Sequence, residues 1–106
     1  MMKMIELDEA RQDMVWRCLN LIHLQKNVSQ VELEYFMRNQ HKRYLGKYSP
    51  YQFIKILLDF KVIKKRNNVA YNVAYPRFSK TKKGLKFLDD WKISPEYAWD
   101  ELKNNP

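Results

Sequence analysis

The chain has 106 residues, 45% of them hydrophobic and only two of them glycine, which argues against a disordered segment and predicts one compact domain. Its single cysteine, Cys18, excludes an internal disulfide, and no apolar run reaches the about 20 residues that cross a bilayer, so we expect a cytoplasmic protein without a membrane span. The formal net charge is +8, but residues 37 to 86 alone hold fourteen Lys and Arg against one acid, Asp59, so a charge of +13 is concentrated there.

The first predicted helix begins after Asp8, an N-cap residue, and ends near Gln25. Spacings of three and four positions predict one buried stripe along it, and Cys18 belongs to that stripe as a small hydrophobic residue. The stripe consists of Met14, Val15, Cys18, Leu19, Leu21 and Ile22.

A second helix is predicted from about Gln30 to Arg38. Ser29 and Glu32 have the spacing of a capping box, and the apolar residues before and after this start have that of a hydrophobic staple. We expect this helix to turn three side chains inward: Val31, Tyr35 and Phe36.

The basic segment from Asn39 to Tyr48 contains Gly46 and predicts a connector with one short helical turn. The strongest helix start of the chain follows, with Ser49 as N-cap, Pro50 as first helical residue and Gln52 as the reciprocal capping partner. This third helix extends to about Asp59. Its predicted buried side chains are Phe53, Ile54, Leu57 and Leu58, and its predicted exposed ones are Tyr51, Gln52, Lys55 and Asp59.

Alternating β-branched and aromatic residues after Phe60 predict a β-hairpin. Its strands are expected on either side of a tight turn at Asn67-Asn68, with Pro76 ending or bending the second strand and residues 77 to 79 continuing extended. Thr81 is the predicted N-cap of a fourth helix to Trp91, with Leu85, Leu88 and Trp91 inward, and Ser94-Pro95-Glu96 opens a short fifth helix. Trp16, Trp91 and Trp99 are interpreted as core or dimer contacts.

This order of helix, helix, helix, β-hairpin and helix resembles a winged helix-turn-helix domain. The stretch 57–65, LLDFKVIKK, is similar to the end of a recognition helix passing into a wing strand, and 78–88, FSKTKKGLKFL, is similar to the T-x-K-G helix start of many archaeal and bacterial regulators. The chain resembles in particular small archaeal and archaeal-virus DNA-binding proteins, which places a viral member in the host cytoplasm. The connector before the third helix is unusually long, and Lys80 replaces the usual leucine before the threonine.

The resemblance implies an α+β, mainly α winged helix-turn-helix domain over residues 1–92, and residues 93–106 add a helix that serves as a dimer contact. It implies a sequence-specific transcription regulator that binds double-stranded DNA as a homodimer. Base contacts are expected from Tyr51, Gln52 and Lys55 in the major groove. Contacts to the DNA backbone, including a wing near 64–68, are expected from Arg38, Lys42, Arg43, Lys47, Tyr48, Ser49, Lys64, Lys65, Arg66, Asn67, Asn68, Arg77, Lys80, Lys82 and Lys83.

Two other functions stay open at this point: RNA or ribosome binding, and a protein-interaction role within a transcription or replication complex. The aromatic residues Tyr71, Tyr75 and Phe78 would stack unpaired bases in the first case, but they are interpreted here as packing on helices. Enzymatic chemistry is not expected, because Cys18 and His23 lie about 140° apart around one helix and do not converge. No metal or other cofactor is predicted.

Overall fold

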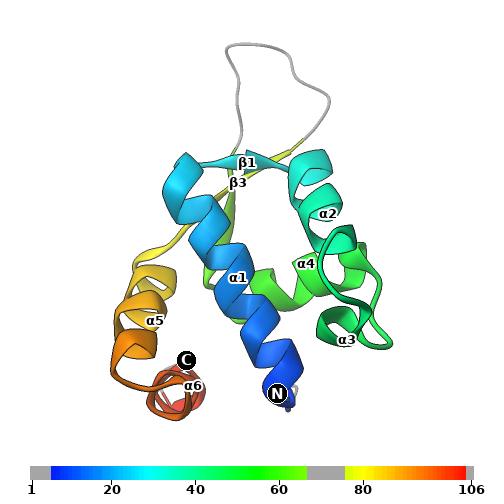
Figure 1. Ribbon diagram of the computed structural model, residues 1–106. Coiled ribbons are helices and arrows are strands. Elements are labelled where there is room, and N and C mark those ends of the chain that lie inside the picture. Colours follow the sequence, from blue (N-terminus) through cyan, green and yellow to red (C-terminus); the bar gives the residue numbers. More distant parts are fainter. Residues whose placement is uncertain (1–5, 67–75, 105–106) are drawn as a thin grey trace.

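The computed structural model describes residues 6–66 and 76–104. Its elements follow in the order α1 (Glu9–Gln25), β1 (Val28–Ser29), α2 (Gln30–Arg38), α3 (Lys42–Leu45), α4 (Pro50–Asp59), β2 (Ile63–Arg66), β3 (Arg77–Lys80), α5 (Lys82–Ile93) and α6 (Pro95–Asn104). The fold is α+β and mainly helical, with one small antiparallel sheet (Figure 1). None of the described helices is both long and apolar enough to cross a membrane.

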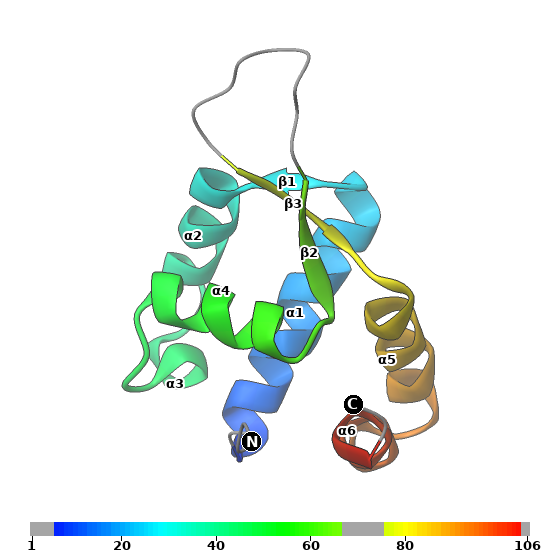
Figure 2. The ribbon, with the colours of Figure 1, turned by 180° about the vertical axis from the view of Figure 1, so that it is seen from behind.

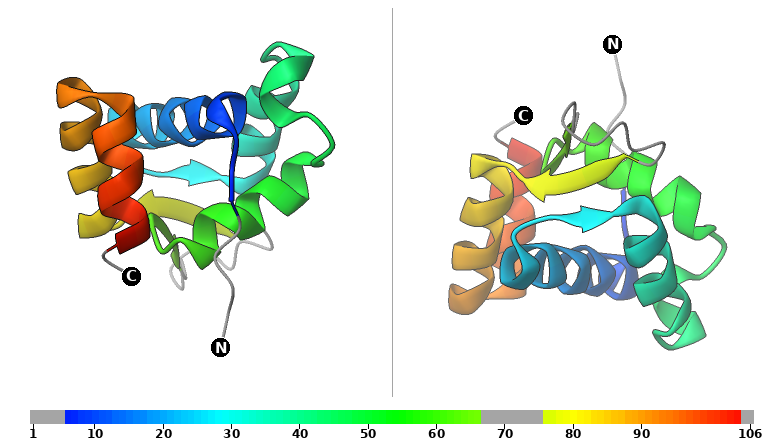
Figure 3. Two further views of the ribbon diagram at one scale, coloured as in Figure 1. Left: turned by 90° about the horizontal axis from the view of Figure 1, so that it is seen from below. Right: turned by 90° about the horizontal axis from the view of Figure 1, so that it is seen from above.

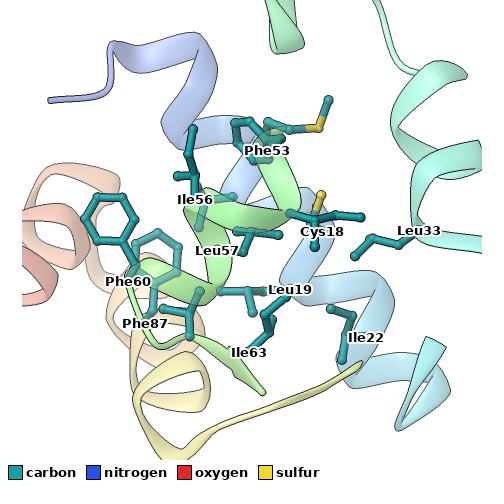
Figure 4. Close-up of a cluster of buried hydrophobic side chains, with 14 of the residues drawn as sticks. Cys18, Leu19, Ile22, Leu33, Phe53, Ile56, Leu57, Phe60, Ile63 and Phe87 are labelled. Atoms are coloured by element: carbon teal, nitrogen blue, oxygen red, sulfur yellow. The ribbon is translucent and has the colours of Figure 1, made fainter. Parts of the chain in front are cut away.

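The core lies between α1 and α4. Cys18, Leu19 and Ile22 of α1 and Phe53 and Leu57 of α4 gather in the same cluster (Figure 4), and all five are buried. The predicted stripe of α1 is confirmed, with Leu21 at its half-buried edge. Burial also raises the pKa of the Cys18 thiol, so this side chain is an inert part of the core.

The sheet joins segments that are far apart in the sequence. Its order is β1-β3-β2, with Val28 of β1 opposite Phe78 of β3 and Ile63 of β2 opposite Lys80. The view from above in Figure 3 shows β1 and β3 crossing the molecule together. Val28, Phe78 and Ile63 are all buried, so the sheet closes the core beyond the end of α1.

Local capping fixes where the helices begin. Asp8, Ser29 and Thr81 each accept a backbone N–H with the side chain, and Ser49 and Gln52 form a complete capping box. The predicted helix starts are therefore confirmed, as is the short turn in the connector, α3.

The C-terminal helix α6 packs against α5 (Figure 1). Ala98, Trp99 and Leu102 of α6 are buried in the same core as Phe87 and Leu88 of α5. Trp99 meets Phe60, at the end of α4, edge to face with ring centres 5.2 Å apart. Trp16 and Trp91 stack at 5.6 Å and are half-buried.

Several predicted orientations are wrong. Val31 and Tyr35 are 59% and 68% exposed, because α2 turns Leu33 and Met37 inward instead, with Phe36 half-buried. In α4, Ile56 is buried and Leu58 only half-buried.

In α5, Leu85 is exposed, and the small Gly84 lies against the core in its place. In the hairpin, Arg66 lies opposite Arg77 and Ile63 opposite Lys80, and the turn predicted at Asn67-Asn68 lies outside the described residues. Phe78 is buried, as interpreted, and Tyr71 and Tyr75 lie outside the described residues.

Candidate nucleic-acid interface

The face that contains α4 and β2 carries the predicted interface. Figure 2 shows these two elements together in front of α1, which lies on the opposite side of the core. Tyr51, Gln52 and Lys55 are exposed in the first two turns of α4, as predicted. Phe53, Ile54 and the buried side chains that follow anchor the other side of the same helix, so the exposed side is held rigidly outward.

Gln52 has its amide oxygen engaged at the start of the helix. Oε1 accepts the Ser49 backbone N–H at 2.9 Å, and Ser49 Oγ accepts the Gln52 backbone N–H at 3.1 Å. A two-point contact with adenine needs both the oxygen and the nitrogen of the glutamine amide. The capping box therefore leaves Nε2 as the group that Gln52 offers to a base.

Tyr51 and Lys55 form a single exposed unit. Lys55 Nζ lies 4.7 Å from the centre of the ring of Tyr51, which is one helical turn away, and Tyr51 is 52% exposed to solvent. The contact is a cation–π interaction, which restricts the lysine without neutralising it. An ammonium held in this way can donate to the acceptors of guanine in a major groove.

The connector places its cations in different surroundings. Arg38 ends α2 and pairs with Glu34 at 3.2 Å, whereas Lys42 and Lys47 are exposed and Lys47 Nζ lies 5.5 Å from the Tyr48 ring. Tyr48 is half-buried and packs edge-on against Phe53. Lys42 and Lys47 are therefore the connector cations most accessible to a phosphate.

Arg43 is part of a structural network around Tyr44. Its Nη2 donates to the Tyr44 hydroxyl at 2.8 Å, and Arg17 of α1 donates to the same oxygen at 2.9 Å. The hydrogen bond from Arg43, together with the charge of Arg17, lowers the pKa of Tyr44. The Tyr44 hydroxyl thus links α3 to Arg17 of α1, and the exposed Arg43 has one of its guanidinium nitrogens engaged by its neighbour Tyr44.

Lys64, Lys65 and Arg66 are exposed along β2. All three belong to the ladder with β3, so they lie on a paired strand, whereas the sequence predicts them at or near the tip of the hairpin. Asn67 and Asn68 fall outside the described residues. Because successive side chains of a strand point to opposite faces, Lys64 and Arg66 share one face of β2 and Lys65 lies on the other.

Arg77 faces a different environment from the one predicted. Its Nε donates to Asn27 Oδ1 at 2.6 Å, and its Nη2 lies 3.6 Å from Glu32 Oε1. These contacts link β3 to the start of α2. Arg77 is therefore a structural residue in this arrangement, and its charge is partly compensated.

The start of α5 gathers Lys80, Lys82 and Lys83 beside Lys61, a residue outside the predicted site. Thr81 Oγ1 donates to the Lys61 carbonyl at 2.6 Å and accepts the Gly84 N–H at 3.0 Å. Burial and the neighbouring charge of Lys61 lower the pKa of Lys83.

Lys61 also has φ +62° just after α4 ends, a conformation that favours glycine. A lysine directly after a helix end is the signal that would have found it.

All fourteen Lys and Arg of residues 37 to 86 lie in the described ranges, and three of them make ion pairs: Arg38, Arg77 and Lys86. The other eleven have no ion pair with a described carboxylate.

Over residues 6–66 and 76–104, no three His, Cys, Asp or Glu side chains come together to hold a metal ion. Comparison with known proteins gave no match to a family model, a curated protein or a solved structure.

Proposed function

We propose that this chain is a winged helix-turn-helix protein that binds double-stranded DNA and reads its sequence with the start of α4. The observation that carries the proposal is the set of eleven cations without a described ion-pair partner. Nine of them lie on the connector, β2 and the start of α5, and the other two are Lys55 on α4 and Lys61 just after it. A surface of uncompensated cations attracts a polyanion by releasing its counterions. A helix of the size of α4 can enter the major groove.

The sheet order supports the same proposal. In a winged helix the strand after the first helix pairs with the returning strand of the hairpin, and β1-β3-β2 has this pairing. The hairpin then lies beside the helix that follows the connector, α4, so both reach one DNA surface. The position of α3 between α2 and α4 accounts for the long connector.

The geometry favours different roles for the exposed residues of α4 and for the cations around it. Lys55, supported by Tyr51, supplies the principal base contact, and Gln52 adds one donor from Nε2. Lys64, Lys65 and Arg66 on β2 and Lys61, Lys82 and Lys83 near the start of α5 contact phosphates. We expect a homodimer to place two α4 helices about one turn of DNA apart, which predicts a palindromic site.

The test is selection of bound sequences from a random duplex pool, followed by affinity measurements on the enriched sequence. Lys55→Ala should weaken binding about tenfold or more, whereas Lys92→Ala, which removes the same charge from the far end of α5, should change it less than about twofold. With about six phosphates neutralised, log affinity should fall against log salt with a slope near −5.

Four outcomes would overturn the proposal. Equal losses in Lys55→Ala and Lys92→Ala would leave only non-specific attraction, and a flat salt dependence would remove the phosphate contacts. Tighter binding of structured RNA than of duplex DNA at matched salt would favour an RNA-binding protein. Absence of any nucleic-acid binding would favour a protein-interaction role.

A further inference from the structure

A groove of about 670 Å³ lies between the start of α1 and the junction of α5 with α6. In Figure 1 these segments lie at the same end of the molecule, away from the sheet. Four of the lining residues carry a carboxylate, two contribute an indole, and none is Lys or Arg. The carboxylates belong to Glu9, Asp13, Glu96 and Asp100, and the indoles to Trp91 and Trp99.

The four carboxylates lack ion-pair partners within the described protein, although Asp13 interacts with the charge of Arg43. None of them makes an ion pair with a described Lys or Arg, although the chain carries a net charge of +8. A cleft lined by one sign of charge concentrates its field and attracts the opposite charge. The occupant of this groove should therefore be cationic.

A single metal ion does not match the arrangement. In the described part of the chain no three acidic, His or Cys side chains converge on one point, so the carboxylates are spread along the walls. The volume lies in the range of about 300 to 1,000 Å³ that pockets for organic ligands occupy. An extended ligand with several charges matches the groove better than one ion.

The two tryptophans add a second and independent feature. Trp91 is held by its stack on Trp16, with ring centres 5.6 Å apart and planes 14° from parallel. Phe87 lies 5.5 Å from the same ring, so Trp91 forms a fixed wall of the groove. Trp99 is only 4% exposed, and its N–H has no acceptor among the described residues, which a peptide carbonyl can supply and a simple amine cannot.

A second copy of the chain, related by a two-fold axis through the groove, is disfavoured. Such a contact brings the same patch of both copies together, so four carboxylates would face four carboxylates. We propose instead that the groove binds a basic peptide segment of a partner protein. Its Lys or Arg side chains lie between the carboxylates, along the wall that Trp91 and Trp99 form.

The experiment is a tryptophan-fluorescence titration at low salt with a capped octapeptide of alternating arginine and alanine. The matched peptide of alternating glutamate and alanine is the control ligand. We expect saturable binding of the arginine peptide and no binding of the glutamate peptide. The Glu9→Gln/Asp100→Asn variant, which changes one carboxylate on each wall, should bind it about tenfold more weakly.

A second variant, Asp59→Asn/Asp89→Asn, removes the same charge outside the groove and should bind the peptide within about twofold of the wild type. Equal weakening by both variants, or no binding of the arginine peptide, would overturn the proposal. So would self-association of the wild type that the groove variant abolishes, because the occupant would then be a second copy. DNA affinity should not fall in the groove variant, so this test is separate from that of the proposed function.

Discussion

Replacement of Gly84 by alanine tests how closely α5 approaches β2. Gly84 is the third residue of α5, and its Cα faces the backbone of Val62. A β-carbon at this position would fall well inside van der Waals distance of the Val62 carbonyl oxygen, 3.2 Å from the Val62 carbonyl carbon and 3.4 Å from Leu19 Cδ2. We expect Gly84→Ala to destabilise the fold, although alanine is the better helix former.

The magnitude follows from opposing contributions. Alanine gains up to about 1 kcal/mol of helix propensity over glycine. Restoring ordinary contact with a rigid carbonyl requires a shift of about 1 Å, and overpacking of this kind costs about 1 to 3 kcal/mol. The same shift strains the Thr81 N–H bond to the Val62 carbonyl, 3.1 Å, and the Thr81 hydroxyl bond to Lys61, 2.6 Å. With about 1 kcal/mol lost from these bonds, the net loss is about 2 kcal/mol.

Urea and thermal unfolding followed by circular dichroism measure this loss. A loss of about 2 kcal/mol should lower the melting temperature by roughly 10 °C for a chain of this size. Lys82→Ala is the control, because it changes an exposed residue of the same helical turn and should shift stability by less than about 0.5 kcal/mol. A Gly84→Ala protein as stable as the wild type would refute the close approach of α5 to Val62.

Three further substitutions test other features. Gly46 has φ +58° and lies against the Arg11 guanidinium, so Gly46→Ala should cost about 1 to 3 kcal/mol in urea unfolding, and no loss would contradict this geometry. Lys61→Gly should raise stability by about 0.5 to 1 kcal/mol yet weaken binding to duplex DNA; unchanged DNA affinity would remove Lys61 from the interface. The side-chain hydrogen bond from Arg11 lowers the pKa of Asp8 from 3.8 to about 2, so its contribution is present above about pH 4 and is lost as the pH falls toward 2. Asp8→Asn should therefore cost less than about 1 kcal/mol at neutral pH and flatten stability between these values, and an unchanged pH profile would contradict the pair.

The helix starts were predictable because their chemistry is local. Asp8, Ser29, Ser49 and Thr81 each cap a backbone N–H three residues ahead, so a short stretch of sequence contains the whole interaction. The side that a short helix buries was less predictable. Either of two stripes of α2 could have faced inward, and the packing against α1 and α4 selected the one with Leu33 and Met37.

The sheet depends on contacts that no local pattern specifies. β1 has only two residues, and its partner Phe78 is 50 residues away from Val28. The asparagine pair at 67 and 68 has the composition of a tight turn, but the pairing of Ile63–Arg66 with Arg77–Lys80 sets another register. Register is decided by which residues the core buries, here Ile63 and Phe78.

The sequence allowed us to predict which residues of the candidate site are exposed, but not which hydrogen-bond and ion-pair partners they have. Tyr51, Gln52 and Lys55 are exposed as the helical period of α4 requires. The engagement of the Gln52 oxygen and the contact between Arg77 and Asn27 depend on the folded geometry. These contacts separate the cations that support the fold from those that remain available to a ligand.

Asp59 constrains how α4 can approach DNA under the proposed function. Tyr51, Lys55 and Asp59 are four residues apart, so they follow one another along one side of the helix, and Asp59 is exposed about 12 Å from Tyr51. A carboxylate in a groove lined by phosphates is repelled, whereas Lys55 is attracted. The helix is therefore expected to enter with its N-terminal half and to leave Asp59 outside. With this orientation, we expect Lys61, which lies just beyond the helix end, to contact the phosphate backbone.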